Sequence, residues 1–296
     1  MANAVSGRFA SGPWQVEYRA GDGGRLSRIA FEGYDLLTGE PARFSPPRAD
    51  VGLYESRPVY GYDDCFPSVV PCRYPGSALN IPDHGELCWL EWDVVESPAR
   101  LRFSVRSRKL PLVFVRTMEF AATSLTWSFE VRNEGDAPHP FLHAMHPLFS
   151  VDEITSVEIP EFECAFDWQT GMMREGMSAA KVSDLLLNRP RGTTEMLFLR
   201  NLRSGEVSCA FRNDMRLKIR FPVEHFPTLG IWWNNRGYPD EDGIRRSECA
   251  FEPTAGDSTD LSREFAGGRA LSVAPGGRFS WQVHWDVETG RSHGSH

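Results

Sequence analysis

The chain has 296 residues, of which 41% are hydrophobic and 24% charged, and this composition is typical of a folded globular protein. The net charge is −8 and the basic residues form no dense stripe, which argues against nucleic acid as a partner. The apolar runs are far shorter than the roughly 18 residues of a membrane-spanning helix and the first residues do not form a secretion signal, so we expect a cytoplasmic protein with no membrane partner.

Segments in which apolar and polar residues alternate recur along the chain and predict strands. Such alternation is typical of a strand with one buried face. In chain order these segments are 101–106, 125–131, 215–221 and 279–287. The chain also contains 26 Gly and 21 Pro beside 19 Phe and 9 Trp, a combination that favours strands and turns over helices.

A helical pattern is present only at 178–188, where Pro190 predicts the end of a short helix. The sequence shows no regular alternation of strands and helices, no internal repeat and no low-complexity linker. We therefore predict an all-β protein with one domain over residues 1–296, built as a large antiparallel sandwich or barrel. The segments 58–84 and 234–260 are expected to be long loops, and long loops on a β scaffold are common places for a functional site.

The six cysteines form no CxxC pair and have no repeated spacing. This pattern predicts neither a zinc ribbon nor a disulfide framework, and we expect reduced thiols. The positions are Cys65, Cys72, Cys88, Cys164, Cys209 and Cys249.

Three histidines are candidates for chemistry. His84 precedes a glycine in a predicted loop, so its imidazole could project into a site, or the segment could be a turn that hydrogen-bonds only locally. His143 and His146 would face opposite sides of a strand, and we expect at most one of them in a site. A metal site would need a third ligand, and no such set is evident in the sequence, so we predict no metal.

Glu252 and the segment around Trp232 are further candidates. Glu252 lies in an apolar segment before Pro253, where desolvation would make it a usable general base; the alternative is a surface glutamate that caps a turn. Trp232 and Trp233 would face opposite sides of a strand, so that one packs in the core and the other offers a flat surface to a sugar ring, unless both are core residues. The polar Asn234 that follows them is a candidate substrate-binding residue.

Four short motifs, in this order, resemble those of the aldose 1-epimerase (galactose mutarotase-like) family. They are GYDDCFP at 61–67, PDHGE at 82–86, HPLF at 146–149 and FEP at 251–253. The resemblance covers nearly the whole chain. It implies a large antiparallel β-supersandwich with a sugar site in a cleft on one concave sheet.

The resemblance also implies roles for three residues. His84 matches a histidine that contacts the sugar near its ring oxygen, His146 matches the general acid and Glu252 the general base. Interconversion of α and β anomers removes a proton from the anomeric hydroxyl and delivers one to the ring oxygen, so that the ring opens and closes again on the other face. This chemistry needs no cofactor and no metal. The expected partner is a small-molecule sugar, and we expect a monomer or a weak homodimer.

The sequence departs from the better-known branches of the family. Hexose-6-phosphate 1-epimerases resemble this pattern but carry an arginine shortly after the His-Gly pair, where this chain has Glu-Leu-Cys at 86–88. Arg73 or Arg43 could compensate for that arginine in binding a phosphorylated sugar. In the galactose mutarotases an aromatic pair follows the second histidine, whereas Pro147 and Leu148 precede the aromatic residue here.

The aspartate that binds sugar in the galactose mutarotases has no single match. The candidates are Asp64, Asp167 and Asp240. The sequence leaves open a hexose-6-phosphate 1-epimerase and a non-catalytic carbohydrate-binding protein. A structural sandwich without a ligand is a further alternative, and it predicts that His84, His146 and Glu252 do not converge.

Overall fold

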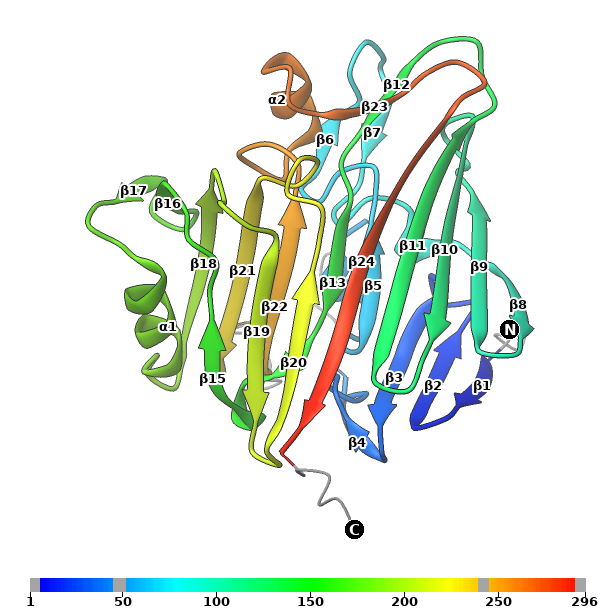
Figure 1. The fold of residues 1–296 in the computed structure, drawn as a ribbon. Coiled ribbons are helices and arrows are strands. Elements are labelled where there is room, and N and C mark those ends of the chain that lie inside the picture. Colours follow the sequence, from blue (N-terminus) through cyan, green and yellow to red (C-terminus); the bar gives the residue numbers. More distant parts are fainter. Residues whose placement is uncertain (1–5, 45–51, 239–244, 291–296) are drawn as a thin grey trace.

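Two layers of antiparallel sheet face each other in the computed structural model, which describes residues 6–44, 52–238 and 245–290 (Figure 1). One layer is a single sheet of eight strands in the order β15-β19-β20-β24-β11-β10-β9-β8. Its strands are β15 (Ile154–Glu158), β19 (Glu206–Phe211), β20 (Met215–Arg220), β24 (Arg278–Thr289), β11 (Ser124–Asn133), β10 (Leu112–Phe120), β9 (Arg100–Arg106) and β8 (Asp93–Ser97).

The other layer consists of two sheets. The first has the order β1-β2-β3-β5-β13, with β4 paired to β3, and the second has the order β14-β22-β21-β18-β16-β17. The strands of the first are β1 (Ser6–Ser11), β2 (Trp14–Arg19), β3 (Arg25–Phe31), β4 (Tyr34–Asp35), β5 (Tyr62–Cys65) and β13 (Ala144–Pro147). Those of the second are β14 (Phe149–Ser150), β22 (Ser247–Thr254), β21 (Thr228–Asn235), β18 (Thr193–Arg200), β16 (Cys164–Asp167) and β17 (Met172–Arg174).

The two sheets of this second layer meet at a seam between β13 and β22, which contact each other. β13 pairs with β5 in the first sheet. After Leu148 the chain enters β14, which pairs with β22 in the second sheet. One short stretch of chain therefore ties the two sheets together, and segments distant in sequence come together at this seam.

The core between the layers is aromatic. Trp127 and Trp285 are fully buried and their ring centroids lie 5.0 Å apart, and Tyr62 packs 4.8 Å from Trp127. Large flat side chains fill the wide space between two extended sheets. Most of the chain's many aromatic residues thus serve the core.

The strands predicted at 101–106, 125–131, 215–221 and 279–287 are confirmed as β9, β11, β20 and β24. The predicted helix is confirmed as α1 (Ala179–Leu187), and the Ser178 hydroxyl caps it by accepting a hydrogen bond from the Lys181 amide. The prediction of one long loop over 234–260 was wrong in its middle, because β22 occupies Ser247–Thr254 as a buried strand. A strand buried on both faces shows no alternation, so the periodicity could not reveal it.

The remaining elements are short and lie in the connections. These elements are η1 (Tyr54–Ser56), β6 (Cys72–Arg73), β7 (Asn80–Ile81), η2 (Leu87–Trp89), β12 (His139–Phe141), η3 (Val151–Glu153), α2 (Leu261–Ala266) and β23 (Leu271–Val273). The segment 58–84, predicted as one long loop, contains β5 and two further small strands.

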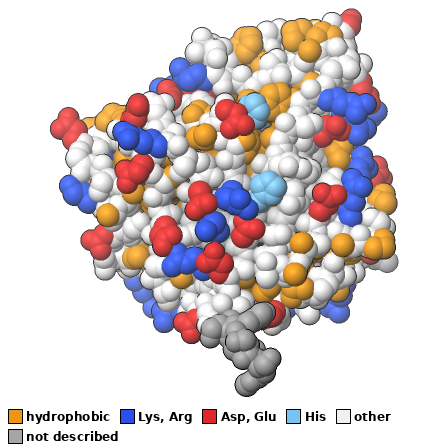
Figure 2. All heavy atoms as spheres, viewed as in Figure 1, with side chains coloured by type: hydrophobic (Ala, Val, Ile, Leu, Met, Phe, Trp, Pro, Cys, Tyr) orange, Lys and Arg blue, Asp and Glu red, His pale blue; other side chains and the backbone are white. Residues whose placement is uncertain are grey.

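Acidic and basic side chains are interspersed on the face shown in Figure 2. Ion pairs between β20 and β24 include Arg220 with Asp286 at 2.5 Å and Lys218 with Glu288 at 3.6 Å. Within the part of the chain that the structure describes, no helix combines the length and the apolar character needed to cross a membrane.

Candidate functional site

The alternation of β5 directs its side chains to two different places. Tyr62 and Asp64 point toward the eight-stranded sheet, where Tyr62 packs on Trp127. Asp63 and Cys65 point the opposite way, because successive residues of a strand face opposite sides. The outer face of the seam is therefore the face on which Asp63 and Cys65 lie.

His146 reaches this face from β13, where it is paired with Asp63. The hydroxyl of Tyr54 donates a hydrogen bond of 2.6 Å to Asp63 and lies 3.3 Å from Nδ1 of His146. Because that hydroxyl proton is already given to Asp63, the hydroxyl oxygen accepts from Nδ1–H of His146. Nε2 of His146 then carries a free lone pair, and it lies 3.6 Å from Oε1 of Glu252.

His84 approaches from the segment that follows β7. Its ring stacks on Tyr54 with centroids 3.8 Å apart and lies 5.3 Å from the ring of His146. Nδ1 of His84 is 2.9 Å from Oδ1 of Asp83, and the other oxygen of Asp83 accepts from the Tyr54 amide at 3.2 Å. Tyr54 thus contacts both imidazoles and also holds the carboxylate that orients one of them.

The backbone at His84 and Gly85 makes this approach possible. Both residues have positive φ, 57° and 73°, and a Cβ on Gly85 would lie 2.0 Å from the carbonyl oxygen of Phe66. The amide of Glu86 donates to that same carbonyl at 2.9 Å. Only glycine fits a left-handed position pressed so closely against another backbone segment.

Replacing Gly85 by alanine is therefore expected to destabilise the protein. Strain at positive φ costs about 1–2 kcal/mol and the forced backbone shift about 1–3 kcal/mol more. Gly76→Ala is the matched control, because Gly76 has a φ of +71° but nothing within 4 Å of an added Cβ. Denaturant unfolding should show the larger loss for Gly85→Ala, and equal losses for the two variants would contradict the close packing at Gly85.

Glu252 enters the site from the middle of β22, opposite Gly230 on β21. Its carboxylate is buried. A glycine directly across from it leaves the space beside the carboxylate free of a neighbouring side chain, as is common where a ligand approaches a strand. The structure thus brings Glu252, His84 and His146 together from three distant parts of the sequence.

The surroundings of Glu252, His146 and His84 shift the pKa values of these three groups in different directions. Burial raises the pKa of Glu252 to about 7, although the positive charge of His84 lowers it. Burial also lowers the pKa of His146 to about 3, and the charge of His84 contributes to the lowering. The pKa of His84 is raised, because the hydrogen bond and the charge of Asp83 outweigh the effect of burial. Of the two imidazoles, His84 therefore holds a proton more strongly than His146.

Cys65 is a member of this site that the sequence did not single out. Its sulfur and one ring nitrogen of each of His84 and His146 all lie within 4.8 Å of one another. The signal was present in the motif at 61–67, where alternation places Cys65 on the face opposite to Asp64. That signal could be used only once β5 was known to be a strand.

The structure places Trp232 and Trp233 on opposite faces of β21, as the alternation predicted. Trp232 is partly exposed and packs with Tyr54 and Ala250 on the face of Glu252, whereas Trp233 lies in the core between the layers. The core position of Trp233 excludes it as a sugar platform. Asn234 is also fully buried, and its side-chain amide donates a hydrogen bond of 2.6 Å to the carbonyl of Tyr238. It is therefore not available to a sugar.

Two of the three aspartate candidates, Asp64 and Asp167, lie in the described part of the chain, and both are occupied by other partners. Asp64 is fully buried behind β5, where Arg116, Tyr62 and His143 use its oxygens, so it is a core residue and does not contact a ligand. Asp167 accepts from Arg174 at 2.7 Å and from two turn amides. Asp240 lies outside the described residues.

Of the two candidate arginines, Arg73 does not join the site. Arg73 lies on β6, where its guanidinium donates to the carbonyl of Ser77 at 2.9 Å, and it lines a different surface hollow. Arg43 is exposed in the connection before β5.

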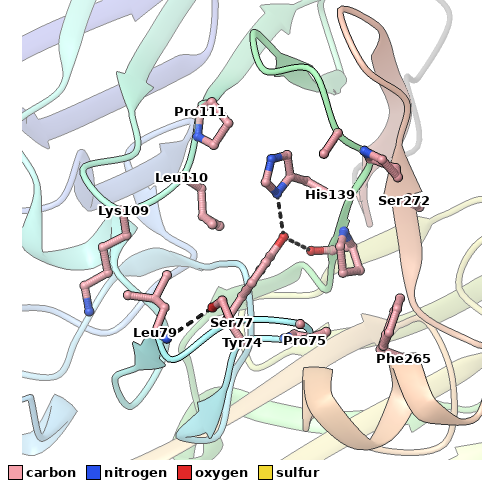
Figure 3. Close-up of a pocket in the computed structure, with 14 residues that line it drawn as sticks. Tyr74, Pro75, Ser77, Leu79, Lys109, Leu110, Pro111, His139, Phe265 and Ser272 are labelled. Carbon is pink, nitrogen blue, oxygen red and sulfur yellow. Dashed lines mark hydrogen bonds between the residues drawn. The ribbon is translucent and has the colours of Figure 1, made fainter.

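A separate hollow of about 530 Å³ lies near β12 (Figure 3). Figure 3 shows Tyr74 at its centre, and the hydroxyl of Tyr74 is 3.0 Å from Nδ1 of His139 and donates to the carbonyl of Pro140. Proline and aliphatic side chains form much of the rest of its lining. It shares no lining residue with the site around Glu252.

No family model matches the chain, and no curated protein matches it in sequence. The Slr1438 protein of Synechocystis sp. PCC 6803 has a similar structure, with a TM-score of 0.75 and 18% identity over 97% of this chain and 96% of that one.

Two further similar structures carry functional names. A protein of Escherichia coli K12, named provisionally as an aldose 1-epimerase, matches with a TM-score of 0.73 and 16% identity over 97% of this chain and all of that one. A galactose mutarotase related enzyme of Lactobacillus acidophilus matches with a TM-score of 0.68 and 14% identity over 96% and 98%. The chain therefore has the β-sandwich fold of the aldose 1-epimerase and galactose mutarotase-like proteins.

Proposed function

We propose that the protein is a cofactor-free aldose 1-epimerase that interconverts the α and β anomers of a sugar. The observation that carries the proposal is the convergence of a buried carboxylate, Glu252, with two imidazoles on one face of the seam. General acid–base work on a single sugar needs such groups within reach of the same ring. The names of the similar structures support the same reaction class.

In the proposed reaction Glu252 removes the proton of the anomeric hydroxyl. The imidazolium of His84, held by Asp83, donates its Nε2 proton to the ring oxygen. The bond between the anomeric carbon and the ring oxygen then breaks and leaves an open-chain aldehyde. Rotation about the bond between C1 and C2 and reversal of the two proton transfers close the ring on the other face.

The acid assignment differs from the one that the family resemblance implies. His146 matches the family's general acid, but its Nδ1 faces a hydroxyl and its pKa is lowered to about 3. His84 is the imidazole paired with a carboxylate, which is the arrangement that holds a proton. We therefore assign the acid to His84, and His146 accepts a hydrogen bond from a sugar hydroxyl through its free Nε2.

The proposal predicts a bell-shaped dependence of kcat/KM on pH, measured with a chelator present. Glu252 must be ionised to accept a proton, so kcat/KM falls about tenfold per pH unit below its pKa of about 7. The fall at high pH reports the loss of the His84 proton. Asp83→Asn removes the partner that raises the pKa of His84, so it should move the high-pH limb to lower pH. An unmoved limb would contradict the acid assignment.

The activity itself is tested by polarimetry on a panel of freshly dissolved free aldoses and hexose 6-phosphates. We expect faster anomer interconversion for at least one free aldose, because Arg73 donates to the carbonyl of Ser77 and is not placed to bind a phosphate beside Glu252. A preference for hexose 6-phosphates would favour the phosphosugar epimerase instead. Quenching of tryptophan fluorescence by sugars without any acceleration would favour a carbohydrate-binding protein, with Trp232 as the partly exposed reporter.

A further inference from the structure

The face that carries Glu252 also gathers a set of metal-binding atoms. The sulfur of Cys65 and a ring nitrogen of each of His84 and His146 lie within 4.8 Å of one another. A carboxylate oxygen of Glu252 is 3.6 Å from Nε2 of His146. Thiolate, imidazole and carboxylate are the three kinds of ligand that Zn²⁺ takes in proteins, and four of them satisfy its tetrahedral preference.

Both imidazoles are oriented as ligands already. Nδ1 of His84 is bonded to Asp83, and Nδ1 of His146 faces the Tyr54 hydroxyl that is bonded to Asp63. Each histidine therefore directs its Nε2 into the site. In metal sites, the ring nitrogen of a histidine ligand that does not bind the metal is usually hydrogen-bonded to a carboxylate or another acceptor, and this bond orients the ring.

The site also has the enclosure of a metal centre. Cys65, His146 and Glu252 are buried, and His84 is the most exposed of the four, with 18% of its side chain accessible. Three ligands are thus shielded from water, while His84 lies where an ion can enter. Cys65, His84 and His146 have to move little to bind one ion, since their separations of up to 4.8 Å exceed those of a tetrahedral zinc site by about 1 Å.

We propose that Cys65, His84, His146 and Glu252 form a Zn²⁺ site whose occupation reversibly blocks the sugar site. A bound ion takes the lone pairs of both imidazoles and of the carboxylate, which are the same groups that the proposed epimerase reaction needs. The blocking effect rests on the proposed function, whereas the binding of the ion does not. Cys65 distinguishes the two roles, because the sugar chemistry assigns it no task.

Titration of the chelator-treated protein with Co²⁺ tests the site, since Co²⁺ is a spectroscopic substitute for Zn²⁺. We expect a thiolate-to-cobalt charge-transfer band that saturates at one equivalent and that Zn²⁺ abolishes. Cys65→Ala should lose the band and weaken Zn²⁺ binding at least about tenfold, the lower end of the loss that is typical even for removal of an outer-shell partner. Cys164→Ala is the control, because Cys164 lies on β16, separated from β22 by two strands, and should keep both.

The outcomes separate the two proposals. No charge-transfer band in the wild-type protein, or an undiminished band in Cys65→Ala, would overturn the metal site. Circular dichroism verifies that the variant is folded; if it is not, His84→Asn replaces it and should weaken Co²⁺ binding by the same factor. Zn²⁺ should also inhibit anomer interconversion. A protein that binds Co²⁺ through Cys65 but never accelerates interconversion would retain the metal site and lose the proposed epimerase.

Discussion

Replacing Glu252 by glutamine is expected to lower kcat for anomer interconversion by about 10²–10⁴-fold. The amide keeps the size and much of the hydrogen bonding of the side chain but cannot accept the anomeric proton. Glu252 is buried beside His146 and opposite Gly230. Because glutamine has the same size as glutamate, the substitution adds no bulk there. Polarimetry or exchange NMR on a free aldose measures the loss, and KM should change much less than kcat.

Glu248→Gln is the matched control for this substitution. Glu248 is a buried carboxylate on the same strand and on the same face, four residues earlier, and burial raises its pKa too. It is bonded to Arg246 at 2.7 Å and stands about 13 Å along the strand from Glu252. We expect less than a tenfold effect on kcat, and similar losses for the two variants would contradict the role of Glu252 as base.

Replacing Asp64 by asparagine is expected to destabilise the protein by about 3–5 kcal/mol without a specific effect on sugar binding. Arg116 and Asp64 form a fully buried ion pair, and Arg116 also donates to the carbonyl of Gly24 at 2.6 Å. Loss of the carboxylate charge leaves the guanidinium uncompensated away from water. Denaturant unfolding measures the loss of stability, and KM measured well below the unfolding temperature should be unchanged.

An exposed ion pair gives the control for the buried one. Asp35 pairs with Arg28 at 2.5 Å, and more than half of the Asp35 side chain is accessible. Asp35→Asn should therefore cost no more than about 1 kcal/mol. If Asp64→Asn were as stable as the wild type but raised KM, Asp64 would be a sugar-binding residue after all, and the burial that excludes it would be misleading.

The strands and the candidate residues could be predicted to different extents from the sequence. Alternation identified β9, β11, β20 and β24, because each has one buried face and one polar face. It could not identify β22, which is buried throughout. Glu252 was nevertheless selected, since a carboxylate in an apolar segment before a proline stands out in any conformation.

The assembly of the site could not be predicted from local patterns. Cys65, His84, His146 and Glu252 lie on four separate segments, and they meet only because β13 and β14 join two sheets at the seam. The side chains of β5 alternate between the two faces of the strand, so that Cys65 lies in the site and Asp64 in the core. Local patterns indicated His84, His146 and Glu252 and the family resemblance implied their roles, but neither indicated the thiol beside them.

A crystal structure with a bound free aldose is the measurement that tests the account most directly. The account predicts that the anomeric hydroxyl lies within hydrogen-bond distance of Glu252, about 2.6–3.2 Å, and that the ring oxygen lies within the same distance of Nε2 of His84. The opposite result would be a sugar seated in the hollow around Tyr74 and His139 with Glu252 untouched. That placement would contradict the proposed acid–base centre.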